Sequence, residues 1–460
     1  LSARHLDKLC ERVDTFSVSG DGERLVVRHR DDTIVVPSSH KVDDDDPAYI
    51  RVDLTRLRRT VNPRAEWRQM FDENGRLMAS HYWREDMNGV DWDSVLNRYR
   101  PLVDLCHVVD DLHDILWETV AELNTSHSYV SASGAAGDSD MRAGLLGADV
   151  SSGDDGARVV RVIPGESSDP RAWSPLRAAG VAVTEGDVIV AVDGRKVGAD
   201  GNLGELLEGS AGRVVELTVR RGENERQVAV VPMADEAPLR YHDWVASRRR
   251  YVEEHSGGRL GYLHVPDMVS DGWAELHRQI GEATRHEGVI ADVRFNHGGH
   301  TSQLVVERLA RRVVGWDYSR WYATADTYPQ NAVRGPIVMV TNQWAGSDGD
   351  IVAAATQAMG YAKVIGERSW GGVVGIDGRF DLVDGTSVTQ PRYAGWYGSY
   401  GWGVENHGVD PDIVVTVSPE DWEADCDVQL DAAIAECLRQ LDDKPAATAP
   451  ELPGPAFGRR

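Results

Sequence analysis

Cysteine is scarce in this sequence: only four stand among 460 residues, and no two of them form a CxxC pair. This spacing excludes a disulfide framework and a cysteine-based zinc site. No apolar run approaches the roughly 20 residues that a membrane-spanning helix needs. The first residues are charged, so no secretory signal peptide is expected. We therefore expect reduced thiols, no membrane partner and a cytoplasmic location.

Basic side chains are few relative to acidic ones. The sequence has 49 Lys and Arg residues against 74 Asp and Glu residues, which gives a net charge of −25. Such a chain repels nucleic acid and anionic membrane surfaces, and no basic stripe offsets the repulsion. An HExxH motif is also missing, so neither a metal nor another cofactor is expected. The length and the 41% hydrophobic content predict a globular chain of about three domains.

The N-terminal residues have the pattern of short strands. A Gly20-Asp21-Gly22 turn separates two of them, and the acidic run at 43–46 marks the first domain boundary. We interpret residues 1–45 as the remnant of a β-propeller, with a loosely docked arm as the alternative. Residues 60–135 follow as a helical domain, with a helix start near Pro63 and apolar residues at helical spacing from Leu102 to Leu123.

Residues 139–235 change to short strands joined by glycine turns. The loop Gly144-Leu145-Leu146-Gly147 precedes the first of them, and the order of elements resembles a PDZ domain. In that family the loop presents backbone N–H groups to a peptide carboxylate, and the neighbouring strand edge accepts the peptide. The alternative is a packing module that binds nothing.

Residues 239–442 alternate strands and helices, which predicts an α/β sheet covered by helices. Apolar strands are expected at 260–265, 288–294 and 335–340. Residues 443–460 are rich in Pro, Ala and Gly, and we expect them to be disordered. The fold class is therefore multidomain α/β.

One serine follows a buried strand in this region. The strand at 335–340 leads into the small-residue turn Ala345-Gly346-Ser347, and a helix opens at Ile351. A strand–turn–helix of this kind projects a hydroxyl at a sheet edge, beside the N–H groups of a helix N-terminus. A plain helix N-cap is the alternative role for Ser347.

Three further segments carry candidate groups. The pair Gly298-Gly299 follows another buried strand and could direct backbone N–H groups at an oxyanion, or form an ordinary turn. His127 lies between Ser126 and Ser128, whose hydroxyls could orient its ring, although an isolated histidine is usually a surface or core residue. Glu405 could anchor a hydroxyl–imidazole chain or lie in a solvated turn.

Together these segments resemble the C-terminal half of the tricorn proteases, in the tail-specific protease superfamily. The resemblance rests on T-S-H-S-Y at 125–129, R-F-N-H-G-G-H-T-S-Q at 294–303, A-G-S-D-G-D at 345–350 and E-N-H-G-V-D-P-D-I at 405–413. It implies a ClpP/crotonase-like α/β catalytic domain and a serine peptidase that cleaves short peptides, such as proteasome products. It also implies assembly of copies of the chain into a hexamer.

The resemblance implies a role for each matching residue. Ser347 would be the nucleophile and His127 the general base, supported by Ser126 and Glu405. Backbone N–H groups of Asp348 and of Gly298 or Gly299 would form the oxyanion hole; His297 stands where another glycine is expected. Asp317 would come from a neighbouring subunit and favour basic residues before the cut, or it is a solvated surface residue.

Two other interpretations use the same fold without catalysis. One is a ligand- or peptide-binding protein, and the other is an interaction scaffold centred on the PDZ domain. A binding relative would have little reason to keep a serine, a histidine and a glutamate in all the matching motifs. Relatives with a serine–lysine dyad are less similar, because the only lysine soon after Ser347 is Lys363, within a strand pattern. We therefore favour the peptidase.

Overall fold

The computed structural model describes residues 8–30, 32–58, 60–132, 141–198 and 201–452. The chain divides into two compact units, Leu1–Glu66 and Trp67–Arg460. In the first unit, four antiparallel strands pair in the order β1-β2-β3-β4. They are β1 Thr15–Val18, β2 Arg24–His29, β3 Asp32–Pro37 and β4 Ile50–Val52. The expected hairpin joins β1 to β2, and a fourth strand follows the acidic run at 43–46.

Three helices lie between residues 63 and 121: α1 Pro63–His81, α2 Trp92–Val103 and α3 Val109–Ala121. The first begins at its proline, as the sequence predicted. The apolar stripe from Leu102 onward is not one helix, because α2 ends at Val103 and Leu105 is 67% exposed. The break has a local cause: the Asp111 carboxylate accepts hydrogen bonds from the N–H groups of His107 and Val108 and so caps a new helix.

A six-stranded sheet follows, in the order β11-β10-β8-β7-β6 with β9 paired to β8. Its elements are β6 Ala148–Gly153, β7 Gly156–Val162, β8 Val188–Val192, β9 Arg195–Lys196, β10 Val215–Arg221, β11 Asn224–Val230, the 3-10 helix η4 Pro175–Arg177 and α4 Leu203–Leu206. In the glycine loop, the N–H of Gly144 donates to Leu207 O and that of Leu145 to Met233 O, both at 2.8 Å. Two N–H groups of this loop are thus bonded within the domain.

The next part is a five-stranded parallel sheet in the order β12-β13-β16-β17-β21. Its strands are β12 Leu260–His264, β13 Gly288–Asp292, β16 Ile337–Thr341, β17 Ala362–Gly366 and β21 Ile413–Val414. Its larger helices are α5 Ala237–His255, α6 Ser270–Ala283, α7 Ser302–Leu309, α8 Asp348–Met359 and α10 Val428–Asp443. The hairpin β14 Gly315–Asp317 and β15 Asp326–Tyr328 and the short helix α9 Pro419–Glu423 complete it.

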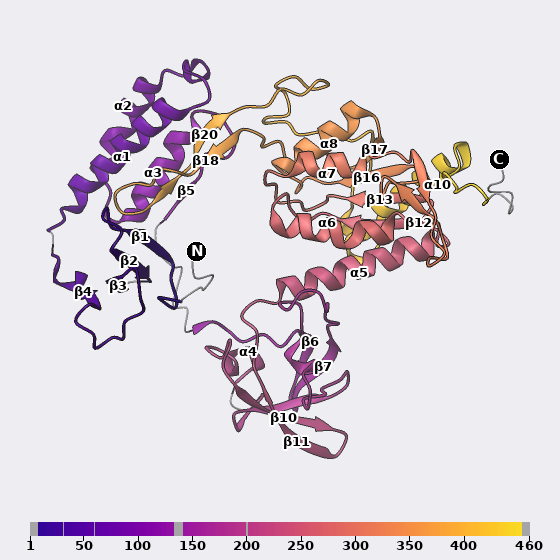
Figure 1. Cartoon of the computed structure of the whole chain (residues 1–460), viewed down its shortest axis with the longest axis horizontal. Helices are drawn as coiled ribbons and strands as arrows, with labels where there is room; N and C mark the ends of the chain where they lie inside the picture. The colour runs from indigo at the N-terminus through magenta and orange to yellow at the C-terminus, as the bar shows by residue number, and fades with distance from the viewer. Residues whose placement is uncertain (1–7, 31, 59, 133–140, 199–200, 453–460) are drawn as a thin grey trace. The chain divides into compact units, whose positions relative to one another are not determined.

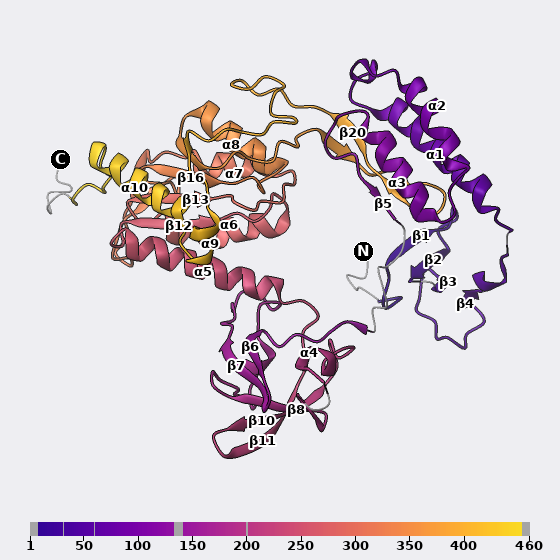
Figure 2. The same cartoon turned by 180° about the vertical axis from the view of Figure 1, so that it is seen from behind.

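Both faces of this sheet are covered by helices (Figures 1 and 2). Val289 and Ala291 of β13 pack in a core with α6, α7 and α8, whereas Ile290 between them packs with α5 and α10. Successive side chains of a strand point to opposite faces of the sheet. The strands are apolar at every position because helices cover both faces. The carboxyl ends of the parallel strands then lie along one edge of the sheet, where β16 leads into α8.

A long excursion from the α/β part, residues 373–393, packs against the three helices; we call it the bridging segment. It contains β18 Gly375–Asp377, β19 Ser387–Val388 and β20 Gln390–Tyr393. β19 pairs with β5 Val130–Ser131, which follows α3, and Val388 belongs to the same hydrophobic core as Val130 and α3. His113 of α3 is within 3.1 Å of the Thr386 hydroxyl. The bridging segment thereby fastens the chain after α3 to the α/β part.

Several expectations concern features that the chain should lack. In the ranges that the structure describes, no helix is long and apolar enough to cross a membrane. No group of three or more His, Cys, Asp or Glu side chains is placed to hold a metal ion within those same ranges. All four cysteines are free thiols.

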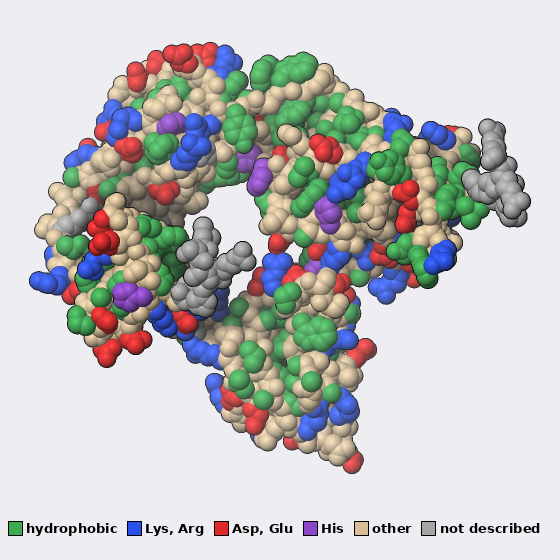
Figure 3. Space-filling view, viewed as in Figure 1, with side chains coloured by type: hydrophobic (Ala, Val, Ile, Leu, Met, Phe, Trp, Pro, Cys, Tyr) green, Lys and Arg blue, Asp and Glu red, His purple; other side chains and the backbone are tan. Residues whose placement is uncertain are grey.

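Acidic and basic side chains are interspersed over the face drawn in Figure 3. In the predicted tail, Ala447 N–H donates to Arg334 O, and residues 453–460 lie outside the described part.

Candidate functional site

Ser347 stands in a strained turn between β16 and α8. Its backbone has φ 58° and ψ −120°, a conformation that residues other than glycine rarely adopt. It occupies the N-cap position of α8, but its side chain makes no capping hydrogen bond. The residue instead borders a cavity of about 600 Å³. A helix cap would commit its hydroxyl to the helix, so this geometry favours the nucleophile over the cap.

His127 borders the same cavity. Its ring packs edge-on against Tyr129 and Trp370, with centroids 5.7 and 5.6 Å away. No hydrogen bond joins its ring to the Ser347 hydroxyl in the structure, although both residues are described. Catalytic hydrogen bonds are often long without substrate and tighten in the reacting complex. The structure thus brings the expected base and nucleophile to one cavity without showing their contact.

Glu405 and Ser126 form a hydrogen-bonded chain that ends on His127. The Glu405 carboxylate accepts the Ser126 N–H at 2.7 Å and the Ser126 hydroxyl at 3.0 Å. The Ser126 oxygen lies 3.1 Å from His127 Nδ1. Because the hydroxyl has given its one proton to the carboxylate, it can only accept from Nδ1–H. This fixes the tautomer in which Nε2 carries the lone pair that a general base needs.

Two backbone N–H groups complete the coordination of Glu405. Val373 and Val374, at the start of the bridging segment, donate to the carboxylate at 2.8 and 3.1 Å. An acceptor that holds four donors is fixed in place. The bridging segment also holds the base directly, because the Thr389 hydroxyl donates to the carbonyl of His127. One segment therefore positions both ends of the Glu405–Ser126–His127 chain.

Burial lowers the pKa of His127 below its ordinary value of 6.5, against smaller raising effects of the Val374 backbone and the Glu405 charge. The ring is packed between aromatic side chains, so the desolvation of its charged form outweighs the attraction to the carboxylate. A lowered pKa keeps the imidazole neutral at neutral pH. It is therefore ready to accept a proton.

The two glycines at 298–299 differ in the availability of their N–H groups. Gly298 N–H donates to Asn296 Oδ1 at 2.8 Å, and a Cβ on Gly298 would lie 2.5 Å from the Cβ of Ser347. Gly299 pairs with Met268 as an isolated parallel bridge, in which Met268 bonds to the residues on either side of Gly299. No acceptor for the Gly299 N–H is found among the described residues. Gly299, which borders the cavity, thus has the free donor.

Asp348 offers the second expected donor. It is the first residue of α8, where backbone N–H groups have no partner within the helix. Its side chain points elsewhere, since the carboxylate accepts the N–H of Ser302 at 3.0 Å, at the start of α7. Burial raises the pKa of this carboxyl, while the Ser302 hydrogen bonds lower it. The turn after Gly299 and the turn at Ser347 are thereby tied together.

Two residues weighed in the sequence analysis lie away from this cavity: Asp317, the substrate-binding candidate, and Lys363, which was not favoured as a base. Asp317 ends β14 of the hairpin, opposite Asp326 on β15, and does not border the Ser347 cavity of its own chain. A role for it in substrate binding would have to come from another subunit. Lys363 on β17 is exposed and lies 3.2 Å from Asp412, so it is engaged away from the serine.

Sequence reasoning missed four residues that shape the site: Tyr129, Asn296, Asp350 and Trp370. Asn296 is buried, donates to Val265 O at 2.8 Å and accepts the N–H of Gly298. Asp350 is also buried and accepts hydrogen bonds from a loop that carries Trp370. The spacing Ser347-x-x-Asp350 is that of a capping box and could have signalled this carboxylate. No local pattern marks the aromatic pair around His127.

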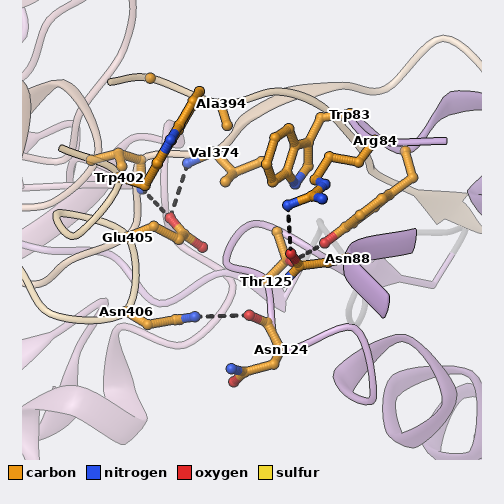
Figure 4. A pocket seen from close by; sticks show the side chains of 13 residues that line it. Trp83, Arg84, Asn88, Asn124, Thr125, Val374, Ala394, Trp402, Glu405 and Asn406 are labelled. Atoms are coloured by element: carbon orange, nitrogen blue, oxygen red, sulfur yellow. Dashed lines mark hydrogen bonds between the residues drawn. The ribbon is translucent and has the colours of Figure 1, made fainter. Parts of the chain in front are cut away.

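A second cavity, of about 420 Å³, lies behind Glu405. Figure 4 shows Glu405 and Asn406 facing Asn124 and Thr125 across it, with Trp83 and Trp402 among its walls. The Asn406 side chain donates to Asn124 O at 2.8 Å. The hydrogen-bonded row Glu405–Ser126–His127 thus has the Ser347 cavity at its His127 end and this pocket at its Glu405 end.

Models of three protein families match the chain. The tricorn protease C1 domain matches residues 63–121, the tricorn protease PDZ domain matches residues 144–235, and peptidase family S41 matches residues 259–415. Ser347 and Glu405 fall within the last match, and His127 falls between the first two.

Known proteins show the same likeness over nearly the whole chain. Tricorn protease homolog 1 of Streptomyces coelicolor is 57% identical over 458 residues, which cover 98% of this chain and 43% of the relative. Tricorn protease of Thermoplasma acidophilum is 35% identical over 96% of this chain and 41% of its own length. A crystal structure of the tricorn protease superimposes with a TM-score of 0.87 at 34% identity, over 96% of this chain and 43% of that one. The chain spans less than half the length of these relatives. It belongs to the tricorn protease family.

Proposed function

We propose that this chain carries the active site of a serine peptidase of the tricorn type, with Ser347 as nucleophile and His127 as general base. The observation that carries the proposal is the hydrogen-bonded chain from Glu405 through Ser126 to His127 Nδ1, beside a strained serine whose hydroxyl is uncommitted. Such an arrangement has little use in a protein that only binds a ligand.

In the first step His127 Nε2 takes the proton of the Ser347 hydroxyl, while the oxygen attacks the carbonyl carbon of a peptide bond. The carbonyl oxygen becomes an oxyanion and accepts hydrogen bonds from the N–H groups of Asp348 and Gly299. Loss of one such donor typically lowers the rate about 10²–10³-fold. The imidazolium is stabilised through Nδ1–H by Ser126, whose own hydroxyl is held by Glu405.

The tetrahedral intermediate then collapses. The C–N bond breaks, and His127 gives its proton to the leaving amine, which departs with the C-terminal part of the substrate. A water molecule, deprotonated by the same imidazole, attacks the acyl-enzyme and releases the N-terminal part. As the acyl bond breaks, His127 passes the proton taken from water to the Ser347 oxygen. Ser347 and His127 thus regain their starting protonation states, while the first serine proton has left with the amine and the water supplies the atoms added to the products.

The substrate and assembly are part of the same proposal. Short peptides such as proteasome products suit a cavity of about 600 Å³. Asp317 of a neighbouring copy would favour Lys or Arg before the cut, in a homo-oligomer that we propose to be a hexamer. We also propose a cytoplasmic location, which suits the free thiols, and we interpret β1–β4 as one blade of a propeller.

The test is covalent labelling with a fluorophosphonate probe, followed by mass spectrometry of the labelled peptide. We expect label on Ser347, none in Ser347→Ala, and a strong loss in His127→Ala. Ser128→Ala is the matched control, because its hydroxyl donates to Thr125 O and stands outside the Glu405 chain. A wild-type protein without label at Ser347 would contradict the proposed function.

A further inference from the structure

We propose that Asp350 is a positioning residue for this reaction: its carboxylate joins the Ser347 turn, the loop 369–372 and the Glu405 loop into one unit. The inference rests on the proposed function and names a residue that acts through the others. Asp350 is the third residue of α8 and is 0% exposed. It touches none of the reacting atoms itself, so its effect must pass through the segments it holds.

The carboxylate collects donors from one loop. Its Oδ1 accepts the Ser369 hydroxyl and the Gly371 N–H, the latter at 2.8 Å, and its Oδ2 accepts the Gly372 N–H at 3.3 Å. Asp350 itself follows the Ser347 turn within the first turn of α8, so the carboxylate ties this loop to the start of the helix that Ser347 precedes.

Trp370 carries the effect to His127. It lies between the residues whose groups bond to Asp350, and its ring packs edge-on against the imidazole at 5.6 Å. Its N–H donates to Ala345 O at 3.0 Å, and its ring lies against Gly346, where a Cβ would approach within 2.6 Å. The loop thus closes over the nucleophile turn and against the base at once.

The Glu405 loop is held through the same residues. Ser369 bonds twice to Val409: its N–H donates to Val409 O at 3.1 Å, and its hydroxyl oxygen accepts the Val409 N–H at 2.8 Å. Asn406 N–H donates to Gly371 O at 2.7 Å, one residue after Glu405. The donors that bind Asp350 therefore also fix the backbone on either side of the carboxylate that orients Ser126.

The chemistry of the site calls for a carboxylate rather than an amide. All groups that face Asp350 are N–H or O–H donors, and an ionised carboxylate is the side chain that only accepts. No cation faces it among the described residues: the nearby titratable groups are Asp348 on the same helix and Tyr397, whose pKa is raised by burial and further by both carboxylates. Burial raises the pKa of Asp350 to about 6, while the hydrogen bonds to it act in the opposite direction. The group is thus ionised at neutral pH and protonates at mildly acidic pH.

The experiment compares Asp350→Asn with Thr356→Val. Thr356 is a matched control, because it is also buried on α8 and hydrogen-bonded, to Val352 O and Tyr361, but does not contact the loop. The readouts are the rate of fluorophosphonate labelling at Ser347 against pH, the affinity for a peptide inhibitor, and thermal unfolding. Asp350→Asn should label about 10–100-fold more slowly, the scale of a small misplacement of reacting groups, with nearly unchanged inhibitor affinity.

The pH profile separates positioning from mere stability. In the wild type, protonation of two groups should lower the labelling rate at acidic pH. One group is His127, and the other is Asp350, which takes up its proton near pH 6. In Asp350→Asn only the His127 step should remain. Thr356→Val should lose thermal stability but keep both the rate per folded molecule and the two-proton profile.

Labelling of Asp350→Asn at the wild-type rate and with the wild-type profile would overturn the inference while leaving the proposed function intact. A wild type and control that both stay unlabelled would instead overturn the function, and the inference with it. If Asp350→Asn does not fold, Ser369→Ala removes one of the three donors to Asp350, together with the acceptor of the Val409 N–H. Ser369→Ala should then label Ser347 more slowly than the wild type does, by less than the 10–100-fold expected for Asp350→Asn. An unchanged labelling rate would again overturn the inference.

Discussion

The carboxylate of Glu405 accepts both the backbone N–H and the hydroxyl of Ser126, at 2.7 and 3.0 Å, across 279 positions of sequence. The double contact fixes the rotamer of Ser126 as well as the position of its backbone. Because His127 follows Ser126 directly, Glu405 acts on the imidazole in two ways. It fixes the backbone that leads into His127, and it fixes the hydroxyl that faces Nδ1. Glu405 therefore orients the ring in addition to stabilising the charge of the imidazolium.

Glu405→Gln should lower the labelling rate at Ser347 by about 100-fold, the lower end of general acid–base effects. The amide NH₂ would face groups that are all donors, so at least one of Ser126, Val373 or Val374 would lose its acceptor. Labelling reactions quenched at successive times would measure this loss of labelling rate. Asn406→Gly is the control, because it removes the contact to Asn124 O and suits the positive φ of 61° at this position. Equal rates in wild type and Glu405→Gln would contradict the orienting role.

Tyr129→Ala should move the acid limb of the pH–rate profile to higher pH. Burial holds the pKa of His127 below 6.5, and protonation of the ring stops catalysis as pH falls through that lowered value. Removing the Tyr129 ring, 5.7 Å from the imidazole, lets water in and brings the pKa back toward 6.5. Trp117→Ala is the control, since Trp117 contacts Tyr129 but not His127. A limb that does not move would contradict desolvation as the cause.

The same substitution has a consequence for stability. A histidine whose folded pKa lies below its unfolded value binds its proton more readily in the unfolded chain. The free energy of unfolding therefore declines as pH falls through 6.5 toward the folded pKa. Denaturant titrations over this window should show a smaller decline in Tyr129→Ala than in the wild type. An equal decline would assign the pH dependence to other groups.

Gly298→Ala should lower the labelling rate at Ser347 by about 100-fold or more, the scale of a misplaced reacting group. Its new Cβ would lie 2.5 Å from the Cβ and 3.0 Å from the Oγ of Ser347, and its φ of +74° is also strained for alanine. Gly281→Ala on α6 is the control, since its Cβ meets nothing closer than 3.8 Å. It should be neutral or stabilise by up to about 1 kcal/mol. Normal labelling of Gly298→Ala would contradict the close packing on the nucleophile.

Asp317→Ala should weaken cleavage after Lys or Arg more than cleavage after Phe. Asp326→Ala is the matched control, because the two carboxylates stand opposite each other on β14 and β15. Like charges in that position repel, so either substitution should stabilise the hairpin slightly. Only Asp317→Ala should change the preference, measured as kcat/KM on paired peptides. The effect should vanish on dilution to single subunits, because Asp317 does not border the cavity of its own chain. Equal losses on both peptides would contradict the assignment.

The sequence predicted the local parts of the site well. The buried strand and small-residue turn before Ser347 and the glycine turn at 298–299 both follow from patterns a few residues long. The helix start was expected at Ile351 but lies at Asp348, because a turn held by a buried carboxylate has no apolar signal. The capping-box spacing from Ser347 could have signalled Asp350, but its burial could not be predicted, since a buried carboxylate without a cation leaves no mark in sequence.

Long-range pairings were the other gap. Nothing local indicates that Ser387–Val388 pairs with Val130–Ser131, and the stripe from Leu102 to Leu123 concealed a helix break that the Asp111 cap creates. The link between His127 and Glu405 came from the resemblance of motifs, not from any periodicity. Contacts across hundreds of positions are decided by packing, which single-sequence patterns do not encode.

The bridging segment also decides when the site can exist during synthesis. A ribosome releases His127 first, then Ser347, then the strand at 387–388, and later Glu405. Strand β5 finds its partner only in β19, and Ser126 finds its carboxylate only in Glu405. A nascent chain that stops short of residue 405 therefore lacks the carboxylate that holds Ser126. On the proposed function, we expect peptidase activity to arise only after Glu405 has left the ribosome.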